Sequence, residues 1–258
     1  MSPEPLLEAR KIVKHFGRVQ ALNGANFTVY PQEVVALVGD NGAGKSTLVK
    51  TLVGVHPPDS GEILFEGERV EIHTPQQARS IGIETVYQDL ALAAEIDPAA
   101  NMFLGREILR KGPLGKLGFL DKAEMRRESE AAFRDLGVQI QDTSAPVANM
   151  SGGQRQGIAI SRAVTWASKV VFMDEPTAAL GVVQTRNVLD QIKRVRDDQG
   201  LAVVLISHNL PEIFEVADRI EVLRLGERVA RLRPSEVSME DVVSAMTGAL
   251  TFHDEDER

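Results

Sequence analysis

The 258-residue sequence contains no cysteine. This absence excludes disulfide bonds, zinc sites with thiolate ligands and a cysteine nucleophile, and it suits a reducing compartment. Long apolar runs are also missing: the longest, with glycine counted, covers residues 200–206, whereas a membrane-spanning helix needs about 20 apolar residues. Residues 1–5 include no basic segment followed by a hydrophobic stretch, so we expect no signal peptide and a cytoplasmic location.

Positive charge is in deficit, because 29 lysine and arginine residues face 37 aspartate and glutamate residues and leave a net charge of −8. An extended nucleic-acid groove gains its affinity from phosphate neutralisation by a basic surface, so we expect no nucleic-acid partner. Part of the acidic excess lies in residues 249–258, which we predict to be a solvated acidic tail. The content of hydrophobic residues, 43%, is ordinary for a folded globular protein.

The order of predicted strands and helices indicates an α/β protein. Two strands, at residues 6–13 and 19–30, are predicted to form an antiparallel edge. Further short strands alternate with helical patterns, which is typical of a mostly parallel sheet with helices on both faces. Strands of this sheet are predicted at residues 34–38, 84–87, 170–173 and 202–206, and a further strand is predicted at residues 62–65. A hairpin around Gly226 and a helix from Ser235 complete the pattern.

Residues 90–166 differ from the rest, because β-branched runs give way to alanine, leucine, methionine, arginine and glutamate. We predict a helical subdomain there. One helix is expected to begin with a capping box at Asp121 and Glu124 and to end at Gly137. Residues 110–120 contain three glycines and a proline and are predicted to be a loop.

A glycine-rich segment follows the predicted strand at residues 34–38 and precedes a helical pattern. It matches the phosphate-binding pattern G-x-x-x-x-G-K-[ST] and reads Gly39-Asp40-Asn41-Gly42-Ala43-Gly44-Lys45-Ser46-Thr47. Glycine is needed because a Cβ atom would keep backbone N–H groups from converging on phosphate oxygens, and the next helix directs its positive end at the same anion. We therefore predict ATP binding, with Lys45 reaching the β- and γ-phosphates and the Ser46 hydroxyl binding Mg²⁺.

Two adjacent carboxylates, Asp174 and Glu175, end an apolar strand. In a nucleotide site, Asp174 is suited to hold Mg²⁺ through its water shell. Glu175 would then lie beside the γ-phosphate and orient or deprotonate the attacking water. The combination with the glycine-rich loop predicts ATP hydrolysis, with Lys45 and Glu175 among the catalytic residues.

A second candidate anion site lies where Ser151, Gly152, Gly153 and Gln154 precede a predicted helix. One ATP molecule cannot occupy both sites of one chain if they lie on different subdomains. The segment resembles the signature of the ATP-binding cassette (ABC) family, and the order of motifs agrees from about residue 6 to residue 248. Two cassettes of that family pair head to tail. The resemblance therefore implies a homodimer in which each ATP lies between one chain's phosphate loop and the other chain's signature.

The same resemblance implies a P-loop NTPase fold of ABC type. We expect one ATPase domain over residues 1–248, with a core at residues 1–89 and 167–248 and the helical signature subdomain at 90–166. Gln88 resembles the family glutamine that contacts Mg²⁺ and water and links the core to the helical subdomain. His208 resembles the histidine that contacts the γ-phosphate, and Phe16 the aromatic residue that stacks on adenine.

One residue departs from the family pattern. After Pro176-Thr177-Ala178-Ala179-Leu180 the family usually has an aspartate that bridges the two cassettes, and this sequence has Gly181. The departure concerns coupling between subunits and leaves the nucleotide-binding residues intact.

Residues 82–88, 101–107, 178–182, 207–209 and 214–219 resemble the ATPases of bacterial monosaccharide importers, especially those of fructose and ribose type. This resemblance implies uptake of a fructose, ribose or xylose type of sugar through a membrane permease supplied by an extracytoplasmic sugar-binding protein. Residues 89–107 would meet the permease, which places the chain on the inner face of the membrane. The alternatives are an exporter ATPase, a soluble cassette ATPase outside transport and a non-catalytic nucleotide-binding regulator.

Overall fold

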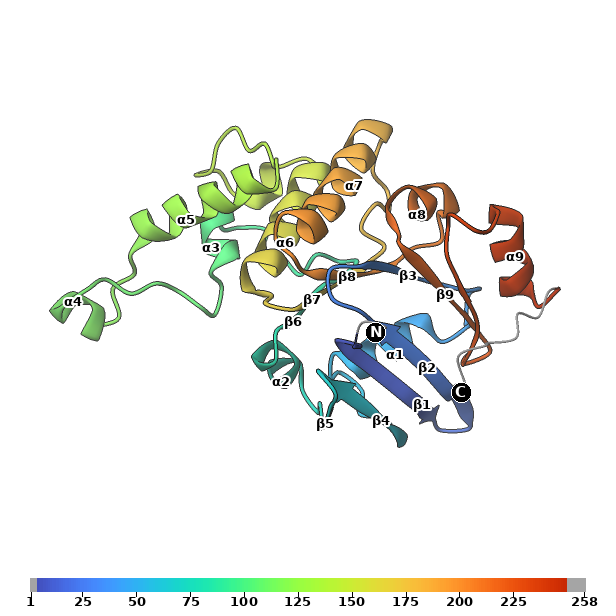
Figure 1. Ribbon diagram of the computed structural model, residues 1–258. Coiled ribbons are helices and arrows are strands. Elements are labelled where there is room, and N and C mark those ends of the chain that lie inside the picture. Colours follow the sequence, from blue (N-terminus) through green and yellow to red (C-terminus); the bar gives the residue numbers. More distant parts are fainter. Residues whose placement is uncertain (1–3, 250–258) are drawn as a thin grey trace.

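The computed structural model describes residues 4–249, and two β-sheets organise this part of the chain (Figure 1). The larger sheet has six strands in the order β10-β9-β3-β8-β7-β6. Its strands are β3 (Val34–Val38), β6 (Ile83–Val86), β7 (Val170–Asp174), β8 (Ala202–Ile206), β9 (Arg219–Arg224) and β10 (Glu227–Leu232). All neighbours pair in parallel except β10 with β9. The predicted mostly parallel sheet is thus confirmed.

The smaller sheet is antiparallel and has the strand order β2-β1-β4-β5. Its strands are β1 (Leu7–Phe16), β2 (Val19–Val29), β4 (Ser60–Phe65) and β5 (Glu68–Val70). The predicted antiparallel edge is confirmed, although β1 continues to Phe16 rather than ending at residue 13. The extra residues pair with β2, and the His15 N–H donates to Asp59 Oδ2 at 2.6 Å, a distant contact that the local pattern does not reveal.

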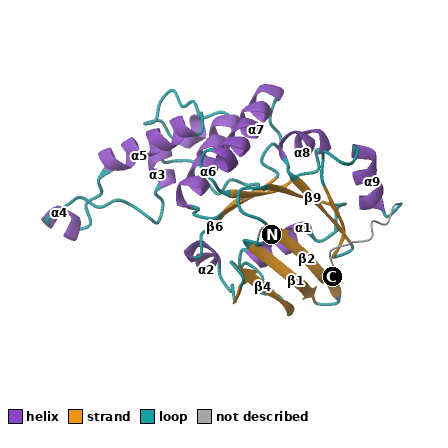
Figure 2. Ribbon diagram, in the orientation of Figure 1, coloured by secondary structure: helices purple, strands orange, loops and turns teal. Residues whose placement is uncertain are grey.

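Helices cover both faces of the larger sheet (Figure 2). They are α1 (Lys45–Leu52), α2 (Pro75–Ser80), α3 (Pro98–Met102), α4 (Pro113–Lys116), α5 (Lys122–Asp135), α6 (Gly152–Trp166), α7 (Val182–Asp197), α8 (Leu210–Val216) and α9 (Met239–Thr247), with a 3₁₀ turn at Val147–Asn149. Helix α1 and the smaller sheet lie on one side, α6, α7 and α8 lie on the other, and α3 to α5 extend to the side (Figure 1). None of the helices described here combines the length and the hydropathy that a bilayer crossing requires.

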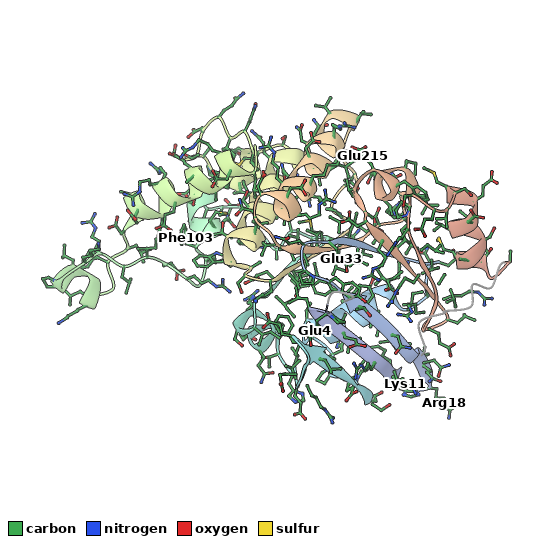
Figure 3. All side chains as sticks on the ribbon, in the orientation of Figure 1. Glu4, Lys11, Arg18, Glu33, Phe103 and Glu215 are labelled. Atoms are coloured by element: carbon green, nitrogen blue, oxygen red, sulfur yellow. The ribbon has the colours of Figure 1, made fainter. Side chains whose placement is uncertain are left out.

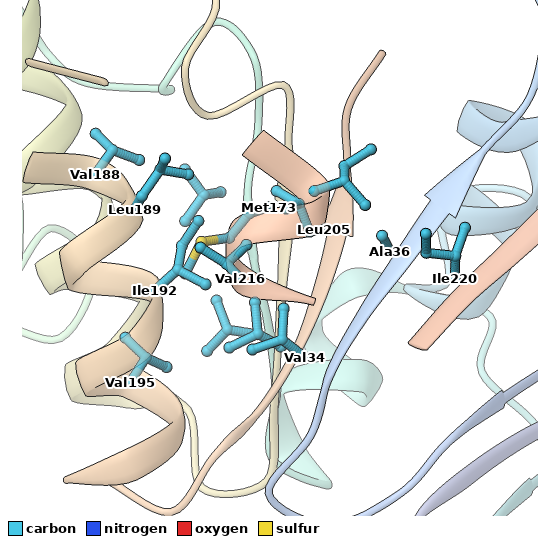
Figure 4. Close-up of a cluster of buried hydrophobic side chains, with 14 of the residues drawn as sticks. Val34, Ala36, Met173, Val188, Leu189, Ile192, Val195, Leu205, Val216 and Ile220 are labelled. Carbon is cyan, nitrogen blue, oxygen red and sulfur yellow. The ribbon is translucent and has the colours of Figure 1, made fainter. Parts of the chain in front are cut away.

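Strand β3 is buried on both faces, which explains its uninterrupted apolar sequence. Val34, Ala36 and Val38 belong to the core beneath α7 and α8, whereas Val35 and Leu37 belong to the core around α1 and the smaller sheet. Figure 4 shows the first core, where the apolar face of α7 packs on the sheet. The cores fix the sheet between two layers, so the loops at the carboxyl ends of its strands start from rigid positions.

Three local predictions differ from the structure. The expected loop at residues 110–120 contains the short helix α4, which begins at Pro113. The last helix begins at Met239, because Ser238 rather than Ser235 caps it. At α5, Asp121 Oδ1 accepts from the Glu124 N–H at 3.2 Å, but the reciprocal half of the expected capping box is not formed.

The predicted acidic tail at residues 249–258 lies, apart from Ala249, outside the described residues.

Candidate functional site

The predicted site residues follow four neighbouring parallel strands at their carboxyl ends. The glycine-rich loop follows β3, Glu175 follows β7, His208 follows β8 and Gln88 follows β6. Ligands of open α/β sheets bind at this edge, because loops from adjacent strands meet there. Sheet order therefore brings together residues that are up to 169 positions apart, as the expected order of motifs requires.

The glycine-rich loop is shaped by close backbone approaches. Gly39 has φ 152°, and a Cβ atom on it would lie 2.1 Å from the Leu223 carbonyl oxygen. Gly44 has φ 104°, and a Cβ atom there would lie 2.7 Å from the Ala21 carbonyl oxygen. Both positions thus exclude any other residue. The loop that results can expose its backbone N–H groups to an anion, as a nucleotide phosphate requires.

Lys45 is the first residue of α1 and lies over the loop that precedes it. Its Nζ donates to the carbonyl oxygens of Gly39 at 2.6 Å and Asp40 at 3.0 Å. Burial lowers the pKa of Lys45, while attraction to Glu175, Asp40 and Asp174 acts in the opposite direction. The ammonium group is therefore close enough to both strand-end carboxylates to share one site with them.

Asp174 is half-buried at the end of β7. Burial raises the pKa of Asp174, and repulsion from Glu175 adds to the rise, whereas Lys50 and Lys45 oppose it. A carboxylate in this position gains from a cation. Within residues 4–249, no cluster of three or more histidine and acidic side chains could hold a metal ion unaided. The hydroxyl of Ser46 and the carboxylate of Asp174 nevertheless fit Mg²⁺, which commonly takes few protein ligands and completes its shell with phosphates and water.

Glu175 and His208 form a direct pair that their separate sequence positions do not reveal. His208 Nδ1 lies 2.9 Å from Glu175 Oε1. The backbone of Glu175 is left-handed, with φ 49°, and its N–H donates to the Ile206 carbonyl at 2.9 Å. The Glu175 side chain is 18% exposed and that of His208 is 77% exposed. A shielded carboxylate held by an open imidazole is a geometry suited to moving a proton from water.

The signature segment begins α6 and caps that helix itself. Ser151 Oγ accepts from the Gln154 N–H at 3.3 Å, and Gln154 Oε1 accepts from the Ser151 N–H at 3.0 Å. Ser151, Gly153 and Gln154 border a cavity of about 450 Å³, whose far wall is formed by α7 residues such as Gln184. Within one chain, the neighbours of the signature are therefore α7 and Gln139 rather than the glycine-rich loop.

Arg162 connects α6 with the loop that follows Gln88, a role that sequence reasoning missed. Its two terminal nitrogens donate to the carbonyl oxygens of Leu90 and Ala91, each at 2.8 Å. Both loop residues are left-handed, with φ 61° and 46°, a conformation that leucine and alanine adopt only under constraint. Gln88 itself is exposed. The guanidinium fork thus holds a strained loop between the strand ends and the signature helix.

Phe16 is the last residue of β1 and is 45% exposed. The ring of His56 meets it edge to face at 5.2 Å. Asp59 tethers the preceding residues, accepting from the His15 N–H and from Lys14 Nζ at 2.8 Å. The exposed face of Phe16 is available for stacking on a flat ring, as predicted for adenine.

Gly181 occupies the N-cap of α7, where it offers no side chain to cap the helix. The next residues, Val182 and Val183, are 88% and 69% exposed. The start of α7 is therefore apolar, and it lies beside the signature segment, because Gly153 approaches Gln184. Exposed apolar side chains next to a candidate site indicate a surface that a partner covers.

A cleft of about 270 Å³ separates the end of β6 from the helical region. It is lined by Tyr87, Leu104, Arg106 and Trp166, among others. Arg106 donates to Glu84 at 2.7 Å and lies 4.7 Å above the ring of Trp166. Trp166 Nε1 in turn donates to the Met102 carbonyl at 2.9 Å. Part of the lining of the cleft, including Leu104 and Arg106, belongs to residues 89–107, the segment predicted to meet a permease.

Comparisons with known proteins agree with this geometry. The family model described as ABC transporter matches residues 22–178. The chain is 51% identical to the fructose import ATP-binding protein of Rhizobium meliloti, with 96% of each chain covered. It is 46% identical to the xylose/arabinose import ATP-binding protein of Sulfolobus acidocaldarius, with 94% of each covered.

A third relative is longer, and the solved structures share the fold. The chain is 40% identical over 96% of its length to a ribose import ATP-binding protein of Escherichia coli O157:H7, of which it spans 47%. It also superimposes on the ADP form of MJ1267, an ATP-binding cassette of an ABC transporter, with a TM-score of 0.76, 25% identity and 95% of each chain covered.

Proposed function

The chain belongs to the ABC transporter family, and from this premise we propose that it is the ATP-hydrolysing subunit of a monosaccharide importer. The observation that carries the ATPase part is the Glu175–His208 pair at 2.9 Å, next to Lys45 and Asp174 at one sheet edge. The importer part rests on relatives of up to 51% identity that are named for fructose, xylose/arabinose and ribose import.

Each group of site residues has a distinct role in ATP binding or hydrolysis. The loop N–H groups and Lys45 bind the phosphates, and Phe16 stacks on adenine. Ser46 and Asp174 would hold Mg²⁺, with Gln88 proposed as a further contact, and the ion would supply charge neutralisation for the β- and γ-phosphates. Glu175 accepts a proton from the attacking water, and His208 orients the Glu175 carboxylate and contacts the γ-phosphate.

The signature is proposed to act on the ATP of a second copy. Ser151 to Gln154 contact their own α7 rather than their own phosphate loop, so a head-to-tail homodimer is needed to complete each site. The exposed Val182 and Val183 supply an apolar surface beside the signature for that contact. The family usually has an aspartate where this chain has Gly181, which adds no side chain. Val182 and Val183 are therefore the main exposed apolar side chains at the start of α7.

Transport requires proteins beyond this chain. We propose that the cleft around Trp166 and residues 89–107 receive a membrane permease, which places the chain on the inner face of the membrane. An extracytoplasmic binding protein would then select the sugar. The core at residues 1–89 and 167–248, and the helical subdomain at 90–166, would move relative to each other as ATP binds.

The catalytic proposal is tested with Glu175→Gln, which removes the charge and keeps the shape. Hydrolysis should fall about a thousandfold, because a general base contributes about 10² to 10⁴ in rate. ATP binding should persist, and an ATP-bound dimer should accumulate in size-exclusion chromatography with light scattering. Near-normal turnover would refute the role of Glu175.

Import is tested separately from hydrolysis. Deletion of this chain should abolish uptake of one labelled sugar in a panel of fructose, ribose, xylose and arabinose, in cells that lack backup importers. Efflux of drugs and lipids should not change. Unchanged uptake of the whole panel would refute sugar import while leaving the ATPase assignment intact.

A further inference from the structure

We propose that residues 108–120, here called the arm, bind the surface of an anionic lipid bilayer directly. The arm follows the permease cleft in sequence and projects away from the body, with α4 at its tip (Figure 1). No role in nucleotide chemistry falls to it. Its side chains extend from this projection (Figure 3).

The arm has a defined structure that its glycine-rich sequence does not suggest. The Arg110 N–H donates to the Phe119 carbonyl at 2.8 Å, and the Asp121 N–H donates to the Ile108 carbonyl at 2.7 Å. Leu109 and Leu120 form an antiparallel bridge. Gly115 closes the tip so tightly that a Cβ atom would lie 1.7 Å from the Arg110 carbonyl oxygen. The arm is therefore a closed hairpin.

This hairpin holds large apolar side chains outward. Leu109 is 50% exposed, Leu114 44%, Leu117 74% and Phe119 54%. One exposed leucine on a protein surface is ordinary, but several on one projection mark a surface that another molecule covers. The hairpin does not bury these side chains against the body, so they remain available to a partner.

The positive charge of the arm indicates which kind of partner it binds. The arm carries Arg110, Lys111 and Lys116 and no acidic residue, in a chain whose net charge is −8. All three cations are exposed. Apolar and basic side chains together are the composition of segments that lie in the interface of anionic membranes. A chain this acidic would otherwise be repelled by such a surface, so the arm supplies the local attraction that is needed.

The position of the arm agrees with this partner. Leu104 and Arg106 line the cleft proposed to receive the permease, and the arm starts two residues later. This step rests on the proposed function, because it takes the cleft to face the membrane. The arm would then reach the bilayer beside the permease and give the cassette a second point of attachment.

The test is co-sedimentation of the purified full chain, without nucleotide, with two kinds of vesicle. One is phosphatidylcholine alone, and the other is an equal mixture of phosphatidylcholine and phosphatidylglycerol. The wild type should bind the mixed vesicles at least tenfold more tightly, and added salt should weaken that binding. Equal binding to both vesicles, or to neither, would overturn the proposal.

Two variants of the arm separate its charge from its apolar surface. Lys111→Gln with Lys116→Gln should weaken binding to the mixed vesicles about thirtyfold, since each cation near an anionic surface strengthens binding about fivefold. Leu117→Ser with Phe119→Ser should weaken binding at least tenfold on the same vesicles. Both variants should keep the wild-type unfolding temperature and ATPase rate, because the arm lies outside the site.

A matched control replaces exposed apolar residues elsewhere, Leu225→Ser with Val243→Ser, which are 73% and 46% exposed in the wild type. This control should bind vesicles like the wild type, and an equal loss would overturn the role of the arm.

Arm variants that bind vesicles normally but reduce transport with the permease would assign the arm to the permease instead. Vesicle binding is measured without ATP or sugar. A negative result would therefore overturn membrane binding by the arm without affecting the proposed ATPase and import functions.

Discussion

Two helices begin at glycine-rich segments of the proposed site, and they begin differently. Helix α1 has Gly44 at its N-cap, and no side chain caps it. Helix α6 has Ser151 at its N-cap, and a reciprocal capping box with Gln154 satisfies two backbone N–H groups. Helix α1 can therefore offer its first backbone N–H groups to an anion directly. In α6, an anion would first have to replace part of the capping box.

This difference indicates an order of events. The phosphate loop can bind a nucleotide in the single chain, because Gly39 and Gly44 shape it without a partner. In the proposed dimer, the signature would engage later, when a second chain brings a phosphate that can replace the Ser151 and Gln154 contacts. Variants at the two helix starts should therefore fail at different steps, and this distinction can be tested.

Among the variants that compare the two helix starts, Lys45→Ala should have the largest effect. The variant loses charge-assisted hydrogen bonds to two phosphates, each contributing about 1.5–3 kcal/mol, so ATP affinity should fall at least about a hundredfold and turnover with it. Isothermal titration calorimetry measures the loss. Lys122→Ala, an exposed lysine at the start of α5 and away from the site, is the control and should bind normally. Equal affinity of Lys45→Ala and wild type would remove Lys45 from the site.

Gly153→Asp should leave ATP binding to the single chain intact and block closure of the dimer. A Cβ atom here lies 2.7 Å from Gln184 Cγ, so Gly153→Asn is the control with the same bulk and no charge. Repulsion of the γ-phosphate should make the Asp variant about tenfold to a hundredfold slower than the Asn variant in hydrolysis.

Mixing the Gly153→Asp chain with the Lys45→Ala chain extends this test. In the mixed dimer, one site carries both lesions and the other carries neither. Partial ATPase activity should return, up to one working site per dimer. No activity should return if both sites must hydrolyse ATP together, and measuring ATP-dependent dimerisation as well as turnover distinguishes that case. A Gly153→Asp chain that closes and hydrolyses like the wild type would contradict a signature that acts on the partner's ATP.

Arg162→Lys should have an intermediate effect, because it loosens the loop that follows Gln88 without removing a residue of the proposed site. Lysine keeps the charge but cannot reproduce the planar fork that binds the carbonyls of Leu90 and Ala91. Hydrolysis should fall about tenfold, which corresponds to about one lost hydrogen bond, with ATP binding unchanged. Hydrogen exchange should rise in residues 88–92. Arg155→Lys on the same helix is the exposed control, and unchanged exchange in Arg162→Lys would refute the tether.

Asp59→Asn should have the smallest effect. Hydrogen bonds from Lys14 and His15 lower the pKa of Asp59 from 3.8 to about 2, so its ionised form stabilises the fold above pH 3.8. That stabilisation is lost as the pH falls from 3.8 towards 2. The wild type should therefore have the higher unfolding temperature at neutral pH, and the difference should vanish near pH 2. A constant difference across this range would show that the Asp59 charge contributes nothing.

The same variant should affect nucleotide binding slightly. Loss of the Asp59 tether frees the end of β1, so the KM for ATP should rise about twofold to threefold with kcat unchanged, as expected when only binding is weakened. Asp59→Glu should restore part of the affinity. A fall in kcat instead would place Asp59 in the hydrolytic step.

Much of the site could be predicted from sequence because its motifs are local. Residues 39–47 form one continuous loop, and Asp174 and Glu175 end one strand, so spacing and residue type were sufficient to predict them. The sheet order then brought these segments together by the general rule for parallel sheets. The predicted roles in binding and catalysis remain for the variants above to test.

Contacts between distant residues could not be predicted in this way. The Glu175–His208 pair spans 33 positions, and the Arg162 bond to Ala91 spans 71. Each depends on where two elements pack, which no local pattern encodes. The arm was missed for another reason: its glycines and proline are typical of a loop, and the hairpin is defined by backbone closure at Gly115.

The stack of Arg106 on Trp166 also has a spectroscopic consequence. Trp166 is the only tryptophan in the sequence, so all indole emission of the protein arises at the cleft that we propose receives the permease. A cation 4.7 Å above the ring and a hydrogen bond from Nε1 make that emission sensitive to small displacements of Arg106. Intrinsic fluorescence of the unlabelled chain therefore reports events at the cleft, and a permease lacking tryptophan could be titrated against it without any added dye.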